Sequence, residues 1–395
     1  MVYLFTLLNI LNYLDRYLVA AVLPALQAEF GLSHQQGGEL QSAFVIGYVI
    51  FAPIFGYLGD RISRPRLMAF GACLWSVATL MSGLAPNFYL LAASRILIGV
   101  GEASFVTAAP GYIKDRIQDP AKVNVALAIF FAAIPVGAAF GYILGGSMVG
   151  PFGWRAAFFT AGVPGIILSG LFLFLKEIRP TISAQVSSVS LTNQVRQILS
   201  IPAIRYALIG YTLNSFALNG VATFMVPLGV AKGFEAGMVG SVFGVILVVS
   251  GFIGTIGGGK LASFFAAQSI HPIATMLKLI GVFSLISAPL FALAFSGAGG
   301  NSFYVSCFLA ELIVFAVVAP VNSILVLTSP AQSVTLTQGI TVLLLNLFGA
   351  FSAPILIGAI ADKIGLELAL QLATIALVGS GLAWLRGARV VRNTP

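Results

Sequence analysis

Four ionisable side chains in the first half of the chain lie inside long apolar segments, where a charge is costly. Asp15 and Arg16 are adjacent in the first segment, and Arg95 and Glu102 lie in the fourth. A spacing of seven residues places Arg95 and Glu102 on one face of a helix to within about 20°. A lone charge in hydrocarbon costs on the order of several kcal/mol, so we expect these groups to face the interior of a helix bundle and to pair. A fifth such residue, Glu311, lies in the tenth segment.

Two acids and two bases could serve either of two purposes. They could form a static salt-bridge cluster, although replacing buried ion pairs with apolar packing is often neutral or stabilising. They could instead line a water-accessible cavity, where burial opposes ionisation of a carboxyl group and neighbouring cations favour it. A conformational change that exchanges the partners would then take up and release protons. We therefore predict that Asp15 and Glu102 are proton-coupling residues.

A second charged cluster, residues 56–66, joins the second and third apolar segments. Two glycines at its start predict a tight turn, and one acid and three arginines follow. Asp60 could stabilise a helix N-terminus while the arginines anchor among lipid head groups. We predict that Asp60, Arg61 and Arg64 form a cytoplasmic gate that holds one conformation. Simple membrane anchoring is the alternative, and the arginines alone would satisfy it.

Other motifs offer little chemistry. Residues 254–260 have the spacing of a phosphate-binding loop, but Leu261 stands where a Ser or Thr should hold magnesium. His34 and His271 fall in connections on opposite sides of the membrane, so we expect no metal site. The sequence has neither an HExxH motif nor a GxSxG nucleophile elbow. We expect neither an enzyme active site nor a cofactor.

The elements that must position these residues follow from composition. Charged residues make up 8% of the chain, against roughly 25% in a soluble domain. Apolar types reach 59% and the mean hydropathy is +1.02. Apolar runs of about 20 residues recur, and each can cross a bilayer of roughly 30 Å. We predict an all-α membrane protein with twelve transmembrane helices, near residues 2–28, 36–58, 67–85, 88–111, 124–148, 155–175, 203–230, 236–259, 273–296, 302–328, 334–360 and 366–386.

The net charge of +8 is a topology signal and does not indicate nucleic-acid binding. Most basic residues fall on one side of the predicted spans, and the opposite connections hold only Arg155, Lys232 and Lys363. The positive-inside rule then places both termini in the cytoplasm. We expect a multi-pass protein of the cell (inner) membrane. The basic residues on the cytoplasmic side are Arg61, Arg64, Arg66, Lys114, Arg116, Lys122, Lys176, Arg179, Arg196, Arg205, Lys260, Arg386, Arg389 and Arg392.

The chain divides into two similar halves. Residues 176–202 are the longest polar interruption and are predicted to form a cytoplasmic linker between six-helix bundles at 1–175 and 203–395. Short motifs recur at nearly constant offsets, such as the prolines at 24 and 227. Pseudo-symmetric halves of this kind are typical of transporters whose site lies near the middle of the membrane.

The fifth predicted helix carries Gly137, Gly141 and Gly145 at intervals of four residues. Small residues let helices approach closely in lipid, where no hydrophobic force drives their association. We interpret these glycines as a packing seam. A hinge is a further hypothesis for the same residues.

Several segments resemble a known family. Residues 56–66 resemble the signature between helices two and three of the major facilitator superfamily, and residues 95–103 look like its helix-four signature. Gly153-Trp154-Arg155 is similar to the common start of helix six. Within the superfamily, residues 12–17 and 99–104 resemble the spinster family of sphingolipid and lysophospholipid carriers. The chain resembles a bacterial-type member of that family.

The resemblance covers roughly residues 12–160 and implies secondary active transport by alternating access. It implies coupling to protons and an amphipathic, lipid-like substrate of the sphingolipid or lysophospholipid class. A head group would meet Arg16 or Arg95 while an acyl chain lies against apolar residues of the second half. The predicted substrate-binding residues are Arg16, Arg95, Glu311, Phe216 and Phe224.

Other classes of function stay open at this point. A passive channel would need a continuous polar pore, whereas duplicated halves with a paired-charge pocket suit alternating access. A transporter-like receptor would bind a ligand without moving it. Among carriers, the alternative substrate is a small organic anion or a drug-like amphiphile. A monomer suffices for this architecture.

Overall fold

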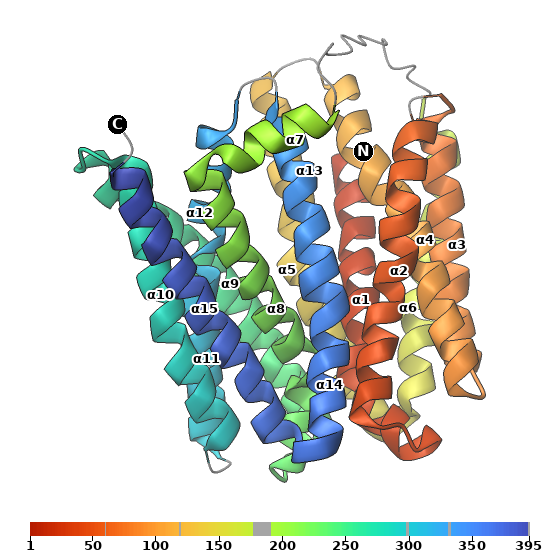
Figure 1. The fold of residues 1–395 in the computed structure, drawn as a ribbon. Helices are drawn as coiled ribbons and strands as arrows, with labels where there is room; N and C mark the ends of the chain where they lie inside the picture. The colour runs from red at the N-terminus through yellow and green to blue at the C-terminus, as the bar shows by residue number, and fades with distance from the viewer. Residues whose placement is uncertain (60, 118–119, 177–190, 298–299, 331–332, 394–395) are drawn as a thin grey trace. The chain divides into compact units, whose positions relative to one another are not determined.

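The computed structural model describes residues 1–395 except 60, 118–119, 177–190, 298–299, 331–332 and 394–395, and all regular structure in the described part is helical (Figure 1). The predicted all-α class is confirmed. Eleven helical segments among the described residues are long and apolar enough to cross a membrane. A twelfth long helix, Val2–Phe30, is not among these eleven, and it carries Asn9, Asn12, Asp15 and Arg16.

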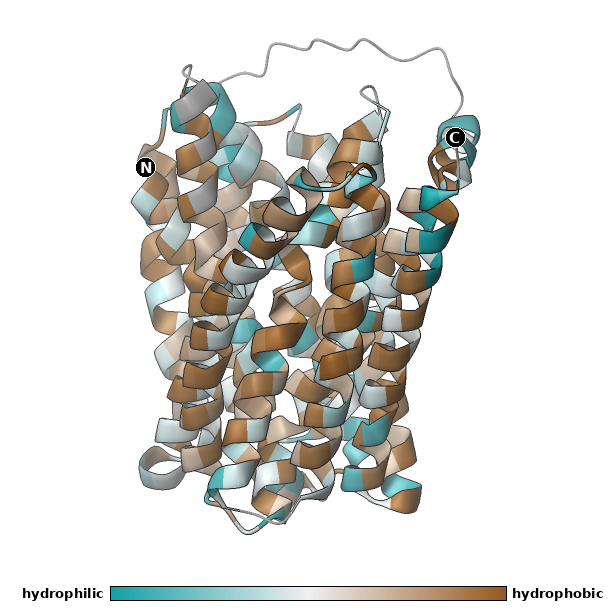
Figure 2. Ribbon diagram, turned by 90° about the vertical axis from the view of Figure 1, so that its left-hand side faces the viewer, coloured by the Kyte–Doolittle hydropathy of each residue, from teal (hydrophilic) through white to brown (hydrophobic). Residues whose placement is uncertain are grey.

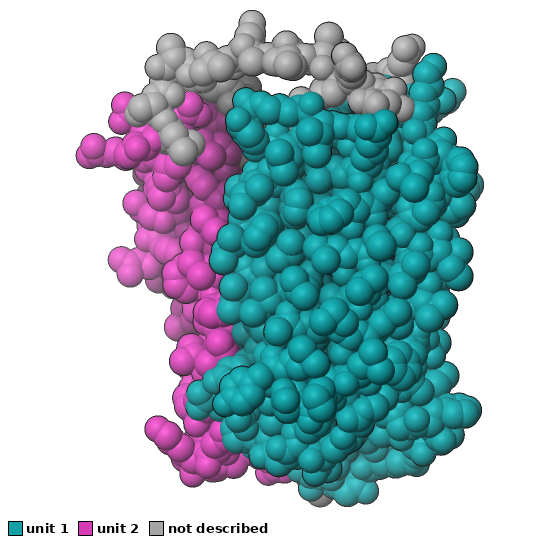
Figure 3. Space-filling model, turned by 90° about the vertical axis from the view of Figure 1, so that its right-hand side faces the viewer, with its two compact units in different colours: residues 1–184, 223–245 teal, residues 185–222, 246–395 magenta. Residues whose placement is uncertain are grey.

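The chain forms two compact units, residues 1–184 with 223–245 and residues 185–222 with 246–395 (Figure 3). The predicted bundles at 1–175 and 203–395 stay a prediction, as does the linker, of which residues 177–190 lie outside the described part. The first unit contains α1 (Val2–Phe30), α2 (His34–Gly59), α3 (Arg64–Leu84), α4 (Phe88–Arg116), α5 (Pro120–Phe152), α6 (Trp154–Leu171) and a 3₁₀ turn at Phe172–Phe174.

Local chemistry sets the ends of these helices. Gly31 ends α1 in the left-handed conformation, at a φ of 64°, which glycine adopts without a steric penalty. Pro65 lies in the first turn of α3, where its missing N–H is not needed. The side chain of Asn87 caps α4 by accepting a hydrogen bond from the Leu90 N–H, with 3.0 Å between the heavy atoms. Gly153, at a φ of 78°, separates α5 from α6.

Glycines bring α4 close to both of its neighbours. A Cβ atom on Gly99 would overlap the backbone of Phe44 on α2. A Cβ on Gly101 would lie 2.6 Å from the carbonyl oxygen of Gly71 on α3. The predicted seam on α5 is also confirmed, because a Cβ on Gly141 would lie 2.6 Å from the Leu14 carbonyl oxygen on α1. Close packing against α2 and α3 therefore positions α4, and close packing against α5 positions α1. These two helices, α1 and α4, carry the predicted charges.

The second unit continues with α7 (Leu191–Ser200), part of α8 (Pro202–Ala231), part of α9 (Ala236–Ala267), α10 (Pro272–Ser296), α11 (Asn301–Phe315), α12 (Val318–Thr328), α13 (Val334–Leu345), a π-helical segment (Asn346–Phe351), α14 (Ser352–Ile364) and α15 (Leu366–Arg392). Helices α8 and α9 contribute residues to both units. Within the predicted linker, α7 forms a short helix that the polar composition did not indicate.

Two predicted helices of this unit are not continuous. The helix expected at 302–328 is broken between α11 and α12, where Pro320 cannot donate the helical hydrogen bond to residue 316. The helix expected at 334–360 contains the π-helical segment. There the Ser215 hydroxyl of α8 donates to the carbonyl oxygen of Leu345, at 3.2 Å between oxygens. A side chain that takes a helical carbonyl is a common cause of such local distortion.

Apolar residues run along most of the length of the helices, and polar residues gather mainly at their ends (Figure 2). Large apolar side chains are exposed in both units, among them Ile167, Ile253 and Leu293. A soluble protein rarely exposes so much contiguous apolar surface, whereas hydrocarbon is a suitable solvent for it. The exposed faces are therefore suited to lipid.

Candidate functional site

The first unit brings together Asp15 and Arg16 on α1 with Arg95 and Glu102 on α4. Asp15, Arg95 and Glu102 are buried. The Nε of Arg16 donates to Oε2 of Glu102 at 2.8 Å, which forms a buried ion pair between the two helices. The prediction that these side chains converge is confirmed, and the predicted pairing is confirmed only in part, because among the described residues only Arg16 and Glu102 of the four form an ion pair. Their role in proton coupling and substrate binding stays a prediction.

Arg95 has a different partner from the one that its charge suggests. Its guanidinium donates to the carbonyl oxygens of Asp15, at 2.9 Å, and Arg16, at 3.4 Å. The side chain of Gln41 on α2 also donates to the Arg16 carbonyl, at 3.1 Å from Nε2. Among the described residues Arg95 forms no ion pair with a carboxylate. It attaches the α1 backbone to α4, and it leaves both acids to other partners.

Asp15 is held by a hydroxyl group. The Thr79 hydroxyl on α3 lies 3.0 Å from Oδ2 of Asp15, and it also lies 2.9 Å from the Trp75 carbonyl oxygen. One hydroxyl proton is thus shared between two acceptors. Oδ1 of Asp15 is buried and has no hydrogen-bond partner in the part of the chain that the structure describes. Asp15 is therefore an acid without an ion pair, beside an acid that has one.

Arg16 lies in an aromatic cage. Its Cζ atom is 4.6 Å from the ring centroids of both Tyr13 and Phe44, and 4.9 Å from that of Tyr48. Such cation–π contacts stabilise a guanidinium that has been removed from water. Arg16 keeps a side-chain exposure of 14%, whereas the side chain of Glu102 has none. Of the pair, only the arginine can be reached from outside.

Sequence reasoning missed several members of this site. Thr79, Gln41, Phe44 and Tyr48 come from α2 and α3, and nothing in their local spacing links them to α1. Tyr13 was detectable, because it precedes Arg16 by three residues and so shares its helix face. The cage and the hydroxyl donor exist only because three helices meet at one point.

The predicted gate residues are partly placed. Arg64 donates from Nε to the carbonyl oxygen of Gly59, at 3.1 Å, and from its guanidinium to Oδ2 of Asp115, at 2.5 Å. The second bond links the start of α3 to the end of α4, and sequence reasoning had not identified Asp115. The Cζ of Arg61 lies 3.4 Å from the ring centroid of Tyr57. Asp60 lies outside the described residues.

The remaining predicted substrate-binding residues come from other helices. Glu311 on α11 and Phe216 on α8 belong to the second unit. Glu311 is buried, and its Oε2 has no hydrogen-bond partner among the described residues. Phe224 belongs to the first unit, where it is fully buried with its ring centroid 6.3 Å from that of His34.

A further network accounts for the Gly153-Trp154-Arg155 motif. Arg155 contacts both carboxylate oxygens of Glu29, at 2.8 Å and 2.7 Å, and the Trp154 indole N–H donates to Oε2 at 2.7 Å. These hydrogen bonds lower the pKa of Glu29 below its ordinary value of 4.5. Arg155 also donates to the Ala85 carbonyl oxygen, at 3.3 Å. The motif therefore joins the ends of α1 and α3 to the start of α6.

Known membrane transporters resemble this chain over most of its length. A model of the Major Facilitator Superfamily matches residues 5–354. The chain is 30% identical over 382 residues to protein spinster homolog 1 of Xenopus laevis, a match that covers 90% of this chain and 72% of that protein. It is 31% identical over 386 residues to a sphingosine-1-phosphate transporter of Mus musculus, covering 90% of this chain and 68% of that one.

Solved structures show a similar fold. A bacterial homolog of the human lysosomal transporter Spinster, in an inward-facing and unoccupied conformation, superposes with a TM-score of 0.88 at 19% identity. That match covers 99% of this chain and 97% of the other. A nucleoside transporter gives a TM-score of 0.72 at 13% identity, covering 100% and 99%. At these identities the likeness is one of fold.

Proposed function

This chain belongs to the major facilitator superfamily and, within it, to the spinster family, and on that premise we propose that it is a proton-coupled carrier of an amphipathic anionic lipid. It is a membrane transporter and not an enzyme. The observation that carries the proposal is the buried Arg16–Glu102 ion pair, with a second, unpaired acid at Asp15. Stability alone explains such a pair poorly, because apolar packing would serve as well.

Arg16 is the proposed contact for the lipid head group. It is caged by three aromatic rings, it retains some exposure, and its planar guanidinium suits a phosphate. A sphingosine-1-phosphate transporter among the relatives supports a phosphorylated sphingoid base or a lysophospholipid as the substrate class. The acyl chain would lie against apolar side chains such as Phe216 and Phe224, with Glu311 as a further binding residue.

Glu102 is the proposed site of proton uptake. While Glu102 is ionised, it occupies Arg16 through the 2.8 Å contact. When Glu102 is protonated, the buried arginine loses its counter-charge and a substrate phosphate can replace it. Binding of the anion and protonation of Glu102 are then thermodynamically linked, so each favours the other. Asp15, held through a single hydroxyl group, is the second proposed proton site.

The carrier would work by alternating access as a monomer in the cell (inner) membrane, with both termini in the cytoplasm. The distribution of basic residues supports this orientation. The Arg64–Asp115 contact is the proposed cytoplasmic gate, together with Arg61 and Asp60, which precede Arg64 in the sequence. Opening of the gate would require these contacts between α3 and α4 to be exchanged.

Reconstitution into proteoliposomes tests the proposal. We expect radiolabelled sphingosine-1-phosphate or a lysophospholipid to accumulate against its gradient when a pH gradient is imposed. We expect Glu102→Gln and Asp15→Asn to remain folded and to lose this proton-driven accumulation. Normal accumulation in both variants would refute the coupling role.

The same assay separates the other classes of function. A channel would equilibrate the solute without concentrating it, and a receptor would bind it without flux. Uptake of small organic anions in preference to lipids would favour the alternative substrate class.

A further inference from the structure

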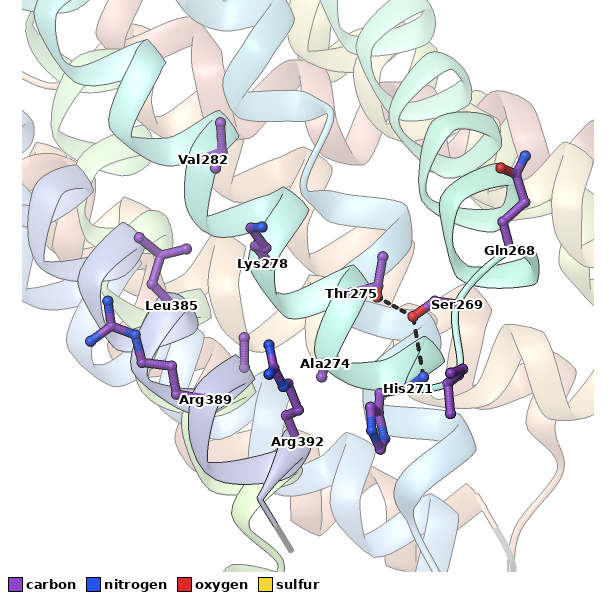
Figure 4. A pocket seen from close by; sticks show the side chains of 12 residues that line it. Gln268, Ser269, His271, Ala274, Thr275, Lys278, Val282, Leu385, Arg389 and Arg392 are labelled. Atoms are coloured by element: carbon purple, nitrogen blue, oxygen red, sulfur yellow. Dashed lines mark hydrogen bonds between the residues drawn. The ribbon is translucent and has the colours of Figure 1, made fainter.

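A cavity of about 990 Å³ lies in the second unit, well away in sequence from the charge cluster of α1 and α4. It is bounded by the end of α9, the first turns of α10 and the last turns of α15 (Figure 4). Every residue that lines it is described and belongs to this one unit. None of the roles proposed above uses this cavity.

The cavity is strongly basic. Lys278 of α10 and Arg389 and Arg392 of α15 line it, together with His271, and the lining includes no Asp or Glu. No carboxylate among the described residues forms an ion pair with any of the three cations. All three side chains are exposed, so they gain little electrostatic stabilisation from other residues of the protein. Three uncompensated cations around one cavity form a site that attracts an anion.

The polar side of the cavity is built by the α9–α10 turn. The Ser269 hydroxyl oxygen accepts a hydrogen bond from the Thr275 hydroxyl, at 2.7 Å, and another from the His271 backbone N–H, at 3.1 Å (dashed lines in Figure 4). Because Ser269 accepts both bonds, its own hydroxyl proton remains to be donated. The first turn of α10 adds the positive end of a helix dipole at the same place.

The three cations lie close to the ends of their helices. Lys278 follows the start of α10 at Pro272 by six residues, which is about 9 Å along the helix axis. Arg389 and Arg392 lie in the last turn of α15. Long basic side chains at this depth reach the level of lipid head groups. The cavity is therefore placed where phosphates of the bilayer lie.

Beyond the cations the same helix faces become apolar and stay exposed. On α10, exposed Val282 and Ile286 follow Lys278 at intervals of four residues. On α15, exposed Leu382 and Val378 precede Arg389 on the same face. A basic cavity that continues into two exposed apolar stripes matches an amphiphile. A free phosphate would need only the basic cavity.

Helices α10 and α15 pack closely against each other beyond their basic residues. A Cβ on Gly281 would lie 3.0 Å from the carbonyl oxygen of Gly381, and the Ser284 hydroxyl donates to the Leu377 carbonyl oxygen at 2.8 Å. The stripes therefore belong to two closely packed helices, and the basic side chains line the cavity from the start of α10 and the end of α15.

We propose that this cavity binds the phosphate head group of an anionic phospholipid of the surrounding bilayer, whose acyl chains lie along α10 and α15. Lys278, Arg389 and Arg392 supply the charge, and Ser269 and His271 supply further donors. The site is separate from the transported substrate. With the orientation proposed above, its lipid belongs to the cytoplasmic leaflet.

Lipid binding by the purified protein in neutral detergent tests the proposal. Phosphatidylglycerol is titrated and bound lipid is counted by native mass spectrometry, with phosphatidylcholine and inorganic phosphate in parallel. Each basic residue near an anionic head group contributes roughly fivefold in affinity, so Lys278→Gln/Arg389→Gln/Arg392→Gln should weaken phosphatidylglycerol binding on the order of 100-fold. The matched control, Arg196→Gln/Arg205→Gln/Lys260→Gln, removes three charges that do not line the cavity and should bind nearly as the wild type does.

A Lys278→Arg variant, which keeps the charge, guards against a folding defect and should retain binding. Equal affinity of the wild type and the triple variant for phosphatidylglycerol would overturn the proposal. Binding of phosphatidylcholine as tight as that of phosphatidylglycerol would also overturn it. Inorganic phosphate that displaces the lipid at equal concentration would overturn the assignment to a lipid.

Discussion

Replacing Arg16 with methionine would leave Glu102 without the one ion-pair partner that it has among the described residues. The Glu102 side chain has no solvent exposure, so water cannot substitute for the lost cation. Removal of one partner from a buried pair costs about 3–5 kcal/mol, whereas removal of both costs little. We therefore expect Arg16→Met to destabilise the protein by about 3–5 kcal/mol, and Arg16→Met/Glu102→Leu to differ from wild type by about 1 kcal/mol.

The assay is thermal unfolding in detergent, followed at neutral and at mildly acidic pH. For a unit of this size, each kcal/mol shifts the midpoint by roughly 2–4 °C, so Arg16→Met should melt on the order of 10 °C lower. The shift should shrink at acidic pH, because a protonated Glu102 carries no charge and needs no counter-ion. The double variant should show no such pH dependence.

The result that would refute this reasoning is specific. If Arg16→Met melts with the wild type at neutral pH, Glu102 is not a buried charge that depends on Arg16. If the double variant is as unstable as Arg16→Met, the loss comes from the aromatic cage and not from the stranded acid. Either result would remove the physical basis of the proposed competition between substrate phosphate and Glu102.

Other changes test the packing and the surface contacts. Gly101→Ala should lower stability by about 1–3 kcal/mol because its Cβ would meet the α3 backbone, whereas Gly170→Ala, with open space around the Cβ, should be neutral or slightly stabilising in the same melting assay. Glu29→Gln should cost at most about 1 kcal/mol above pH 4.5; since the folded pKa of Glu29 is lowered, this difference should fade as the pH drops through that lower value, and a constant difference would contradict the assignment. Arg64→Gln and Asp115→Asn should change initial uptake rates in proteoliposomes by a similar factor, and the double variant should add no further change; additive effects would mean that the two do not act through their mutual contact.

The sequence determined the transmembrane helices well. The cost of placing a charge or an unpaired backbone group in hydrocarbon is large, so runs of apolar residues identify helices with little help from context. The one long helix outside the eleven candidate spans of the described residues, α1, carries Asp15 and Arg16 of the site. The interruptions at Pro320 and at the π-helical segment were not predicted. The second depends on a hydroxyl, that of Ser215, from another helix.

The sequence also identified which charges would meet, and it did so from energy alone. Asp15, Arg16, Arg95 and Glu102 had to converge because none is tolerable by itself in lipid. Their partners were a different matter. Charge alone gives no reason to expect that Arg95 would bind backbone carbonyl oxygens or that Asp15 would bind a threonine hydroxyl.

Only the tertiary structure decided those contacts between different helices that the energetic cost of a charge in lipid does not demand. The aromatic rings around Arg16, the contact of Arg64 with Asp115 and the cavity between α10 and α15 are of this kind. A helix repeats every 3.6 residues, so a sequence records which residues share a face of that helix. Which face of a neighbouring helix lies opposite that face depends on where the two helices can pack closely, as they do at the glycines. The residues that decide this packing are spread over many helices.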